Sequence, residues 1–84
     1  MTQKNILFFN SSTCGPCRLA KTQLTEAVIE DLNVDIKSFS AEDNWEMFSQ
    51  YQVASVPTFI RVDESGNEIA RKVGFKTLED IKGL

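Results

Sequence analysis

Two cysteines, Cys14 and Cys17, stand close together in the sequence Cys-Gly-Pro-Cys. They are the only cysteines among 84 residues, and the chain contains no histidine. The pair directly follows an apolar run from Ile6 to Phe9. A C-x-x-C pair between a strand and a helix favours reactive thiols, because a thiolate is stabilised at a helix N-terminus. The spacing therefore predicts thiol–disulfide exchange.

The two thiols have different predicted roles. Exchange needs an attacking thiolate, a second thiol that resolves the mixed disulfide, and access for the partner. Cys14 falls at the predicted helix N-terminus, where N–H groups and the helix dipole should lower its pKa below the free value of about 8.5. Cys17 lies one turn further in. It begins an apolar stripe at three- and four-residue steps with Ala20, Leu24, Ala27 and Val28, so its thiol should be shielded and should attack second. Gly15 permits close approach by a partner, and Pro16 suits the first helical turn.

Other roles for the cysteine pair fit the sequence less well. A structural disulfide across two residues closes too small a loop to restrict the unfolded chain much. A tetrahedral zinc site needs four ligands, whereas this chain offers two thiols and no imidazole. We therefore expect no metal and no cofactor. An iron–sulfur cluster bridged between two chains is a remoter alternative, which a colourless sample with two titratable thiols would exclude.

Length and composition predict a single domain, residues 1–84. With 42% hydrophobic and 25% charged residues, the composition is typical of a soluble globular protein. The net charge of −3 and the scattered Lys and Arg residues argue against nucleic-acid binding. The longest apolar run has four residues and no segment resembles a signal peptide, so we expect a cytoplasmic protein without a membrane span. We also expect a monomer.

The hydrophobic pattern predicts four strands and three helices in the order β-α-β-α-β-β-α. The strands are expected from Lys4 to Phe9, Val34 to Phe39, Thr58 to Val62 and Glu68 to Val73. The helices are expected from Gly15 to Asp31, around Trp45 to Tyr51, and after Thr77. The first two strands should be parallel and the last two should form a hairpin. This order predicts an α/β domain with a mixed four-stranded sheet and helices on both faces.

Three local signals mark the ends of the predicted helices. Asn33 can close the first helix in the left-handed conformation. The segment from Ser40 to Asp43 resembles a capping box that opens the second helix. The segment from Thr77 to Asp80 is a second pattern of this kind, and it should start a short final helix with Leu78 and Ile81 facing inward.

The motifs and their order resemble the thioredoxin family. C-G-P-C follows a strand, S-V-P-T comes about forty residues later, and K-V-G precedes the last helix. The resemblance runs from about Ile6 to the C-terminus. It implies a minimal thioredoxin fold in which Cys14 is the nucleophile, Cys17 is the resolving thiol, and the peptide bond between Val56 and Pro57 is cis.

The resemblance also implies a substrate-binding groove beside the first cysteine. In the family the cis-proline loop faces this cysteine, and the residue before the proline pairs its backbone with the substrate peptide. Val56 has that position here, and Gly74 corresponds to the glycine that borders the groove. The residues assigned in this way to substrate binding are Thr13, Gly15, Pro16, Val56, Pro57, Gly74 and Phe75.

The sequence departs from the family pattern in several places. The sequence starts at what would be the central strand, without the N-terminal strand and helix of the family. Its length is therefore nearer that of glutaredoxins. Thr13 replaces the tryptophan that usually precedes C-G-P-C, which predicts a smaller and more polar groove. Phe8 stands where the family buries an aspartate that assists the resolving cysteine, and Ser38 replaces a nearby basic residue. Thr22 replaces the proline that kinks the active-site helix, which predicts a straighter helix.

Two enzymatic functions remain open. The first is a dithiol–disulfide oxidoreductase that reduces protein disulfides and is recharged by a flavoenzyme of the thioredoxin reductase type. The second is a glutaredoxin-like enzyme that takes electrons from glutathione. The short length favours the second, but glutaredoxins typically carry C-P-Y-C, and Gly74-Phe75 beside Lys76 is the nearest match to a glutathione site. A coupled assay that compares the two electron sources distinguishes them.

A third alternative is a non-catalytic binding module. It would hold a partner in a groove around Trp45, Val56 and Phe75. The spacing of Trp45, Phe48 and Tyr51 argues against this alternative, because it predicts a helix face that packs on the sheet rather than a recognition surface.

Overall fold

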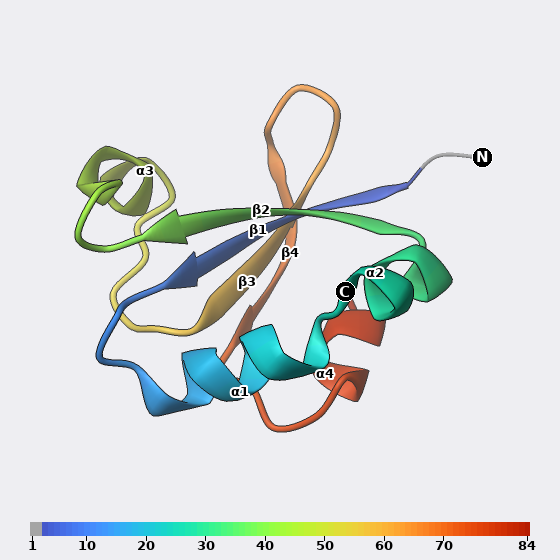
Figure 1. The fold of residues 1–84 in the computed structure, drawn as a ribbon. Helices are drawn as coiled ribbons and strands as arrows, with labels where there is room; N and C mark the ends of the chain where they lie inside the picture. Colours follow the sequence, from blue (N-terminus) through green and yellow to red (C-terminus); the bar gives the residue numbers. More distant parts are fainter. Residues whose placement is uncertain (1–2) are drawn as a thin grey trace.

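A computed structural model describes residues 3–84 and shows one four-stranded sheet (Figure 1). The strands are β1 (Lys4–Asn10), β2 (Val34–Ser40), β3 (Thr58–Val62) and β4 (Glu68–Val73), in the spatial order β2-β1-β3-β4. Strand β1 is parallel to β2 and antiparallel to β3, and β3 and β4 form an antiparallel hairpin. The predicted mixed sheet is confirmed.

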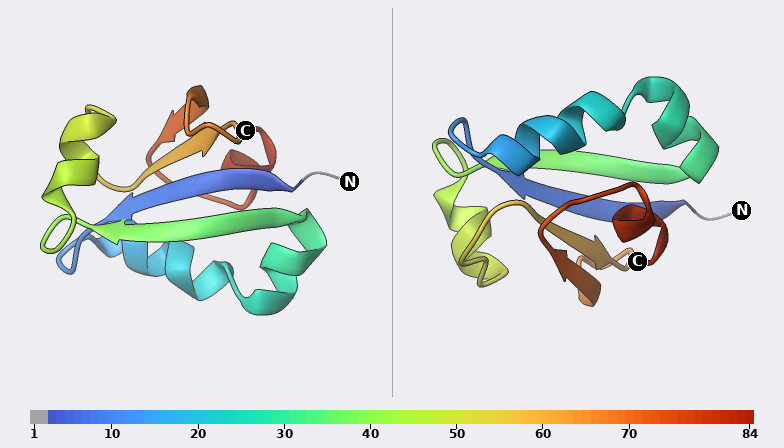
Figure 2. Two further views of the ribbon diagram at one scale, coloured as in Figure 1. Left: turned by 90° about the horizontal axis from the view of Figure 1, so that it is seen from above. Right: turned by 90° about the horizontal axis from the view of Figure 1, so that it is seen from below.

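Helices cover both faces of this sheet. In the described residues they are α1 (Gly15–Gln23), α2 (Glu26–Leu32), α3 (Trp45–Gln50) and α4 (Glu79–Lys82). Helices α1, α2 and α4 lie on one side of the sheet, and α3 lies on the other (Figures 1 and 2). The predicted two-sided arrangement is confirmed. Within residues 3–84, no helix has the length and apolar character that crossing a membrane requires.

The central strand β1 is buried along most of its length because it has strands on both edges and helices on both faces. Ile6 and Phe8 belong to the core under α1, α2 and α4, and Phe8 stacks on Phe59 of β3 with ring centroids 4.6 Å apart. Leu7 and Phe9 belong to the core under α3. A strand covered in this way has apolar residues on both faces, which explains the absence of alternation in its sequence.

The predicted helix from Gly15 to Asp31 is two helices, so the expectation of a straighter helix is wrong. The break lies at Leu24, which leaves the helical region with φ −87° and ψ 65°. The Thr25 hydroxyl accepts a hydrogen bond from the Val28 N–H at 3.3 Å and so caps a new helix. Upstream, the Thr22 hydroxyl donates to the Arg18 carbonyl at 2.9 Å, a back-bond that commonly bends helices. A residue other than proline therefore disturbs the helix here.

Of the two signals predicted to end the first helix and to open the second, the first is confirmed and the second is wrong. Asn33 adopts the left-handed conformation, with φ 56°, and closes α2 as expected. The predicted capping box at Ser40 is wrong, because the Ser40 hydroxyl donates to Asp43 at 3.2 Å within a turn. The Asn44 side chain accepts from the Ser40 N–H at 3.2 Å, and α3 begins only afterwards. The polar side chains stabilise the turn rather than the first turn of the helix.

Helix α3 contains Trp45 and Phe48, and Tyr51 follows it directly. Phe48 and Tyr51 contact the core around Phe9, with the Phe48 ring edge-on at 5.0 Å. Trp45 is 67% exposed, so the predicted three-residue face is wrong for this residue. Side chains six positions apart on a helix differ in direction by about 120°, which is too wide for a short helix to bury both ends of the series.

The start of α4 is organised by one carboxylate. Asp80 accepts hydrogen bonds from the backbone N–H groups of Lys76 at 2.7 Å and Thr77 at 3.2 Å, which is half of the predicted capping box. The other half is not formed, because the Thr77 hydroxyl accepts from the Glu79 N–H at 3.3 Å. The N–H groups of Lys76 and Thr77, together with the Lys72 ammonium 3.7 Å away, hold the pKa of Asp80 below its ordinary value. Ile81 is fully buried, as predicted. The carboxylate thereby fixes the chain between β4 and α4.

We predict that Asp80→Asn removes a pH-dependent part of the stability. Because the pKa of Asp80 is lowered in the folded state, the ionised carboxylate contributes its full stabilisation above the unfolded pKa of about 3.9, and this contribution is lost as the pH falls through the lower folded-state pKa. Urea unfolding should therefore show wild type more stable than Asp80→Asn at about pH 7 and the two converging at about pH 3. A difference that is the same at both pH values would contradict this account.

We predict that Thr25→Ala destabilises the protein by about 1 kcal/mol, the usual loss when an N-cap hydroxyl is removed. Thr22→Ala is the matched control, since its hydroxyl bonds a helix carbonyl and alanine has the higher helix propensity. Chemical denaturation of both variants measures the difference. Equal stability of the two variants would show that α1 and α2 do not need this cap.

Candidate active site

The cysteine pair lies where the central strand passes into the first helix. Strand β1 ends at Asn10, and after three residues Cys14 takes the N-cap position of α1 with extended backbone angles, φ −93° and ψ 110°. Pro16 occupies the first turn of the helix, as expected. The Cys17 N–H donates to the Cys14 Sγ at 3.1 Å. A helix N–H group therefore points at the first sulfur, which is the arrangement that stabilises negative charge there.

The two cysteines form a disulfide, with their Cα atoms 5.2 Å apart. Cys14 is 7% exposed and Cys17 only 1%. Both side chains belong to the core cluster that also contains Phe59 and Phe75. Cys14 is therefore the more exposed of the two residues.

The chain before β3 and the chain after β4 meet beside this cluster. The peptide bond between Val56 and Pro57 is cis, as the family resemblance implied. Val56 packs against the core cluster that contains Cys14 and Cys17. The Pro57 carbonyl accepts a hydrogen bond from the Gly74 N–H at 2.8 Å, which joins the proline loop to the loop after β4.

Two residues of the loop after β4 complete this region. Gly74 has φ 90°, in the left-handed region that favours glycine. Phe75 is buried in the cluster with the cysteines, and its ring lies 5.9 Å from that of Phe59. The predicted groove residues thus divide into four that are buried or half-buried, namely Val56, Pro57, Gly74 and Phe75, and an exposed set next to Cys14. The exposed set is Thr13, Gly15 and Pro16.

Glu42 holds the active-site loop, which sequence reasoning missed. Its carboxylate accepts from the Ser12 N–H, 3.3 Å from each oxygen, and from the Ser12 hydroxyl at 3.2 Å. Arg18 donates to the Ser12 carbonyl at 3.4 Å. The Ala41 N–H donates to the Asn10 carbonyl at 2.8 Å. The loop before Cys14 is therefore fastened to the loop after β2, about 30 residues away, and no local sequence signal reports such a contact.

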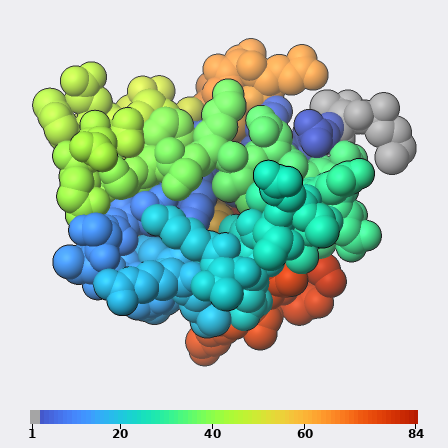
Figure 3. Space-filling model, viewed as in Figure 1, coloured from blue at the N-terminus to red at the C-terminus, as the bar shows by residue number. Residues whose placement is uncertain are grey.

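Phe8 and Ser38 occupy neighbouring positions on β1 and β2. Phe8 is 3% exposed, and the Ser38 hydroxyl accepts a hydrogen bond from the Asn10 amide at 2.7 Å. A cleft of about 300 Å³ opens beside them between the helices and β2, on the face drawn in Figure 3. Its lining residues are Phe8, Lys21, Leu24, Ile29, Ile36 and Ser38. None of these six residues is acidic, so the cleft has no carboxylate to accept a proton.

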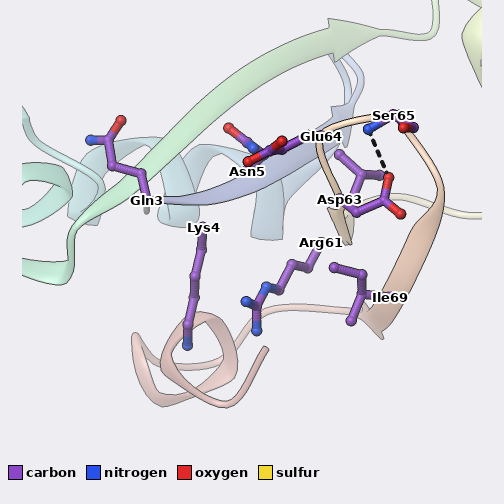
Figure 4. A pocket seen from close by; sticks show the side chains of 9 residues that line it. Gln3, Lys4, Asn5, Arg61, Asp63, Glu64, Ser65 and Ile69 are labelled. Carbon is purple, nitrogen blue, oxygen red and sulfur yellow. Dashed lines mark hydrogen bonds between the residues drawn. The ribbon is translucent and has the colours of Figure 1, made fainter. Parts of the chain in front are cut away.

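A polar hollow of about 430 Å³ lies at the opposite end of the sheet (Figure 4). It is lined by the start of β1, the end of β3 and the hairpin that follows β3, including Lys4, Arg61, Asp63 and Ile69. The Ser65 N–H donates to the Asp63 carboxylate at 2.9 Å within that hairpin. No cysteine lines this hollow, so it is separate from the disulfide.

Comparison with known proteins gives consistent results. The family model described as Thioredoxin matches residues 1–84. Thioredoxin from Chlamydia pneumoniae is 36% identical over 76 residues, which cover 90% of this chain and 74% of that protein. A bifunctional thioredoxin reductase/thioredoxin from Mycobacterium leprae is 33% identical over 69 residues, which cover 81% of this chain and 15% of that protein.

Solved structures show the same fold. Oxidised mitochondrial thioredoxin 3 from Saccharomyces cerevisiae aligns with a TM-score of 0.80 at 22% identity, covering 99% of this chain and 77% of that one. The predicted minimal thioredoxin fold is thus confirmed. Sequence, fold and disulfide together establish that this chain belongs to the thioredoxin family and is a thiol–disulfide oxidoreductase, whose active-site disulfide joins Cys14 and Cys17.

Proposed function

We propose that this protein reduces disulfides of other proteins, with Cys14 as the attacking thiolate and Cys17 as the resolving thiol. The observation that most directly supports this assignment is the Cys17 N–H, whose nitrogen lies 3.1 Å from the Cys14 Sγ. This donor stabilises negative charge on Cys14, both when it attacks and when it leaves. The greater exposure of Cys14 supports the same assignment.

The reaction runs in two exchanges. The Cys14 thiolate attacks one sulfur of the substrate disulfide, forming a Cys14–substrate disulfide and releasing the other substrate sulfur as a thiolate, which takes up a proton. Cys17 then loses its proton and attacks the Cys14 sulfur, which releases the second substrate thiolate. The substrate disulfide gains two electrons, and the protein is left with the Cys14–Cys17 disulfide seen in the structure.

The substrate chain would lie across the loops that surround Cys14. Val56 precedes the first residue of β3, so its backbone lies outside the ladder of that strand and can pair with an extended peptide. Gly74 is bonded to Pro57 and borders the same region. The exposed Thr13, Gly15 and Pro16 would contact the peptide from the other side of the sulfur. The remaining groove residue, Phe75, supports the loop from the core.

We propose that a flavoenzyme of the thioredoxin reductase type returns electrons to this disulfide in the cytoplasm. The Mycobacterium leprae relative supports this, because its name joins such a reductase and a thioredoxin in one protein. Glutathione is the second candidate donor. The backbone N–H groups of Lys76 and Thr77, beside the nearest match to a glutathione site, are bonded to Asp80 and are therefore not available to a glutathione carboxylate.

We predict that the reduced protein has one fast and one slow thiol. Cys14 should react with iodoacetamide at neutral pH at least about ten times faster than Cys17, because it is more exposed and receives a helix N–H. Mass spectrometry of timed samples at a series of pH values would give both rates and the pKa of Cys14. Equal rates at the two cysteines would contradict the assignment of roles.

We predict that Cys17→Ser traps a mixed disulfide with a protein substrate, whereas Cys14→Ser abolishes turnover. Insulin reduction should be supported by NADPH with thioredoxin reductase, and much less by glutathione with glutathione reductase. Both coupled assays follow NADPH consumption on one protein sample. Full turnover by Cys17→Ser would exclude the dithiol mechanism, and faster turnover with glutathione would exclude the proposed donor.

A further inference from the structure

Trp45 is a large apolar side chain that the core does not use. It is 67% exposed, whereas Phe48 and Tyr51 of the same helix pack on the sheet. Tryptophan is among the residues most enriched at the energetic centres of interfaces, where its large ring is covered by a partner.

The position of Trp45 relates it to the active site. It is the first residue of α3, three residues after Glu42, whose carboxylate binds Ser12 in the loop before Cys14. The loops after β1 and β2 lie at the same end of the sheet, and α3 starts there (Figure 2). A protein partner typically covers about 800 Å² on each side, so a substrate engaged at Cys14 extends well beyond the groove itself.

Charge around Trp45 indicates what kind of segment would cover it. Glu42, Asp43 and Glu46 flank Trp45 in the sequence, all three are exposed, and the five residues from Glu42 to Glu46 include no basic side chain. A cation is attracted both by these carboxylates and by the face of an indole ring. A second copy of this chain, related by a two-fold axis at this surface, would bring the same three carboxylates against them. The complementary partner is therefore a basic segment.

We propose that Trp45, with Glu42, Asp43 and Glu46, forms an accessory docking site for protein substrates that carry a basic and apolar segment outside their disulfide. This inference rests on the proposed reduction of protein disulfides. The site touches none of the reacting sulfurs. It raises the rate with such substrates by holding them near Cys14, and it contributes nothing to the reduction of a small disulfide.

The test compares two synthetic peptides with the same intramolecular disulfide and a flexible linker. One peptide ends in Lys-Leu-Lys and the other in Glu-Leu-Glu, and hydroxyethyl disulfide is the small substrate. Reduced protein is mixed with each, and second-order rate constants are measured in a single turnover. Trp45→Ala should lower the rate with the basic peptide about tenfold and leave hydroxyethyl disulfide unchanged. Ile69→Ala is the matched control, because Ile69 is 54% exposed and lies at the opposite end of the sheet.

Two further measurements test the same site. Glu46→Lys should slow the basic peptide and accelerate the acidic one. Trp45 is the only tryptophan of the chain, so binding of a basic peptide with serines in place of its cysteines should shift the tryptophan emission of the oxidised protein. Unchanged emission, or charge reversal without effect, would count against the site.

The outcomes separate this inference from the proposed function. Equal rates of wild type and Trp45→Ala with the basic peptide would overturn the docking site alone, provided that wild type reduces hydroxyethyl disulfide. An equal loss with the peptide and with hydroxyethyl disulfide would also overturn it, because the effect would then lie at the thiols. A wild-type protein that reduces neither substrate would overturn both proposals.

Discussion

The chemistry of this protein depends on one sulfur being held at the start of a helix. The Cys17 N–H lies 3.1 Å from the Cys14 Sγ, so the first turn of α1 stabilises charge on that atom. This geometry exists because β1 is buried on both faces and its end is fixed in the core. Cys14 is the N-cap only because the strand stops at Asn10 and the helix begins at Gly15. The packing of an apolar strand therefore sets the position of a thiol that the strand does not contain.

Three other segments of the chain complete the site, and each is attached by a specific bond. Glu42 fastens the loop before Cys14 through Ser12. The Gly74 N–H and the Pro57 carbonyl, 2.8 Å apart, join the loops before β3 and after β4. These bonds are long-range in sequence, so the site exists only in the folded chain. The surface that a substrate meets is assembled from loops, while the sheet and the core cluster keep those loops in register.

The sequence predicted the elements that a local pattern of residues marks, and it did not predict the features that lack such a pattern. The four strands were predictable because each is a short apolar or alternating run between turn residues. The break at Leu24 was not, because the apolar stripe of Ala20, Leu24, Ala27 and Val28 continues across it at helical spacing. The cis bond before Pro57 came from family resemblance alone, since most X–Pro bonds are trans.

The misplacement of Trp45 has a related cause. Its spacing with Phe48 and Tyr51 follows helical steps, but the three side chains spread too widely for the short α3, which begins at Trp45 itself, and the ring is left outside the core. The bond between Glu42 and Ser12 had no sequence signal at all, because nothing local marks a contact between two exposed polar residues so far apart in the chain. Periodicity reports which face a residue occupies, and it does not report where the neighbouring elements end.

At Phe8, a residue that packs the core occupies a position where the family resemblance places an acid that assists the resolving cysteine. Its ring stacks on Phe59 at 4.6 Å, in the same cluster as Cys17, at the position where the resemblance places a buried aspartate. A carboxylate there would have to be taken out of water, which is costly without a partner, and Ser38 supplies only a hydroxyl already bonded to Asn10. The aromatic ring instead adds packing to a small core. The cleft beside Phe8 is lined without a carboxylate, whereas the backbone of α1 gives the Cys14 sulfur an N–H donor. In this chain a stacked aromatic pair therefore occupies the position of the buried acid, and the donor seen at the Cys14 sulfur is the Cys17 N–H of the helix terminus.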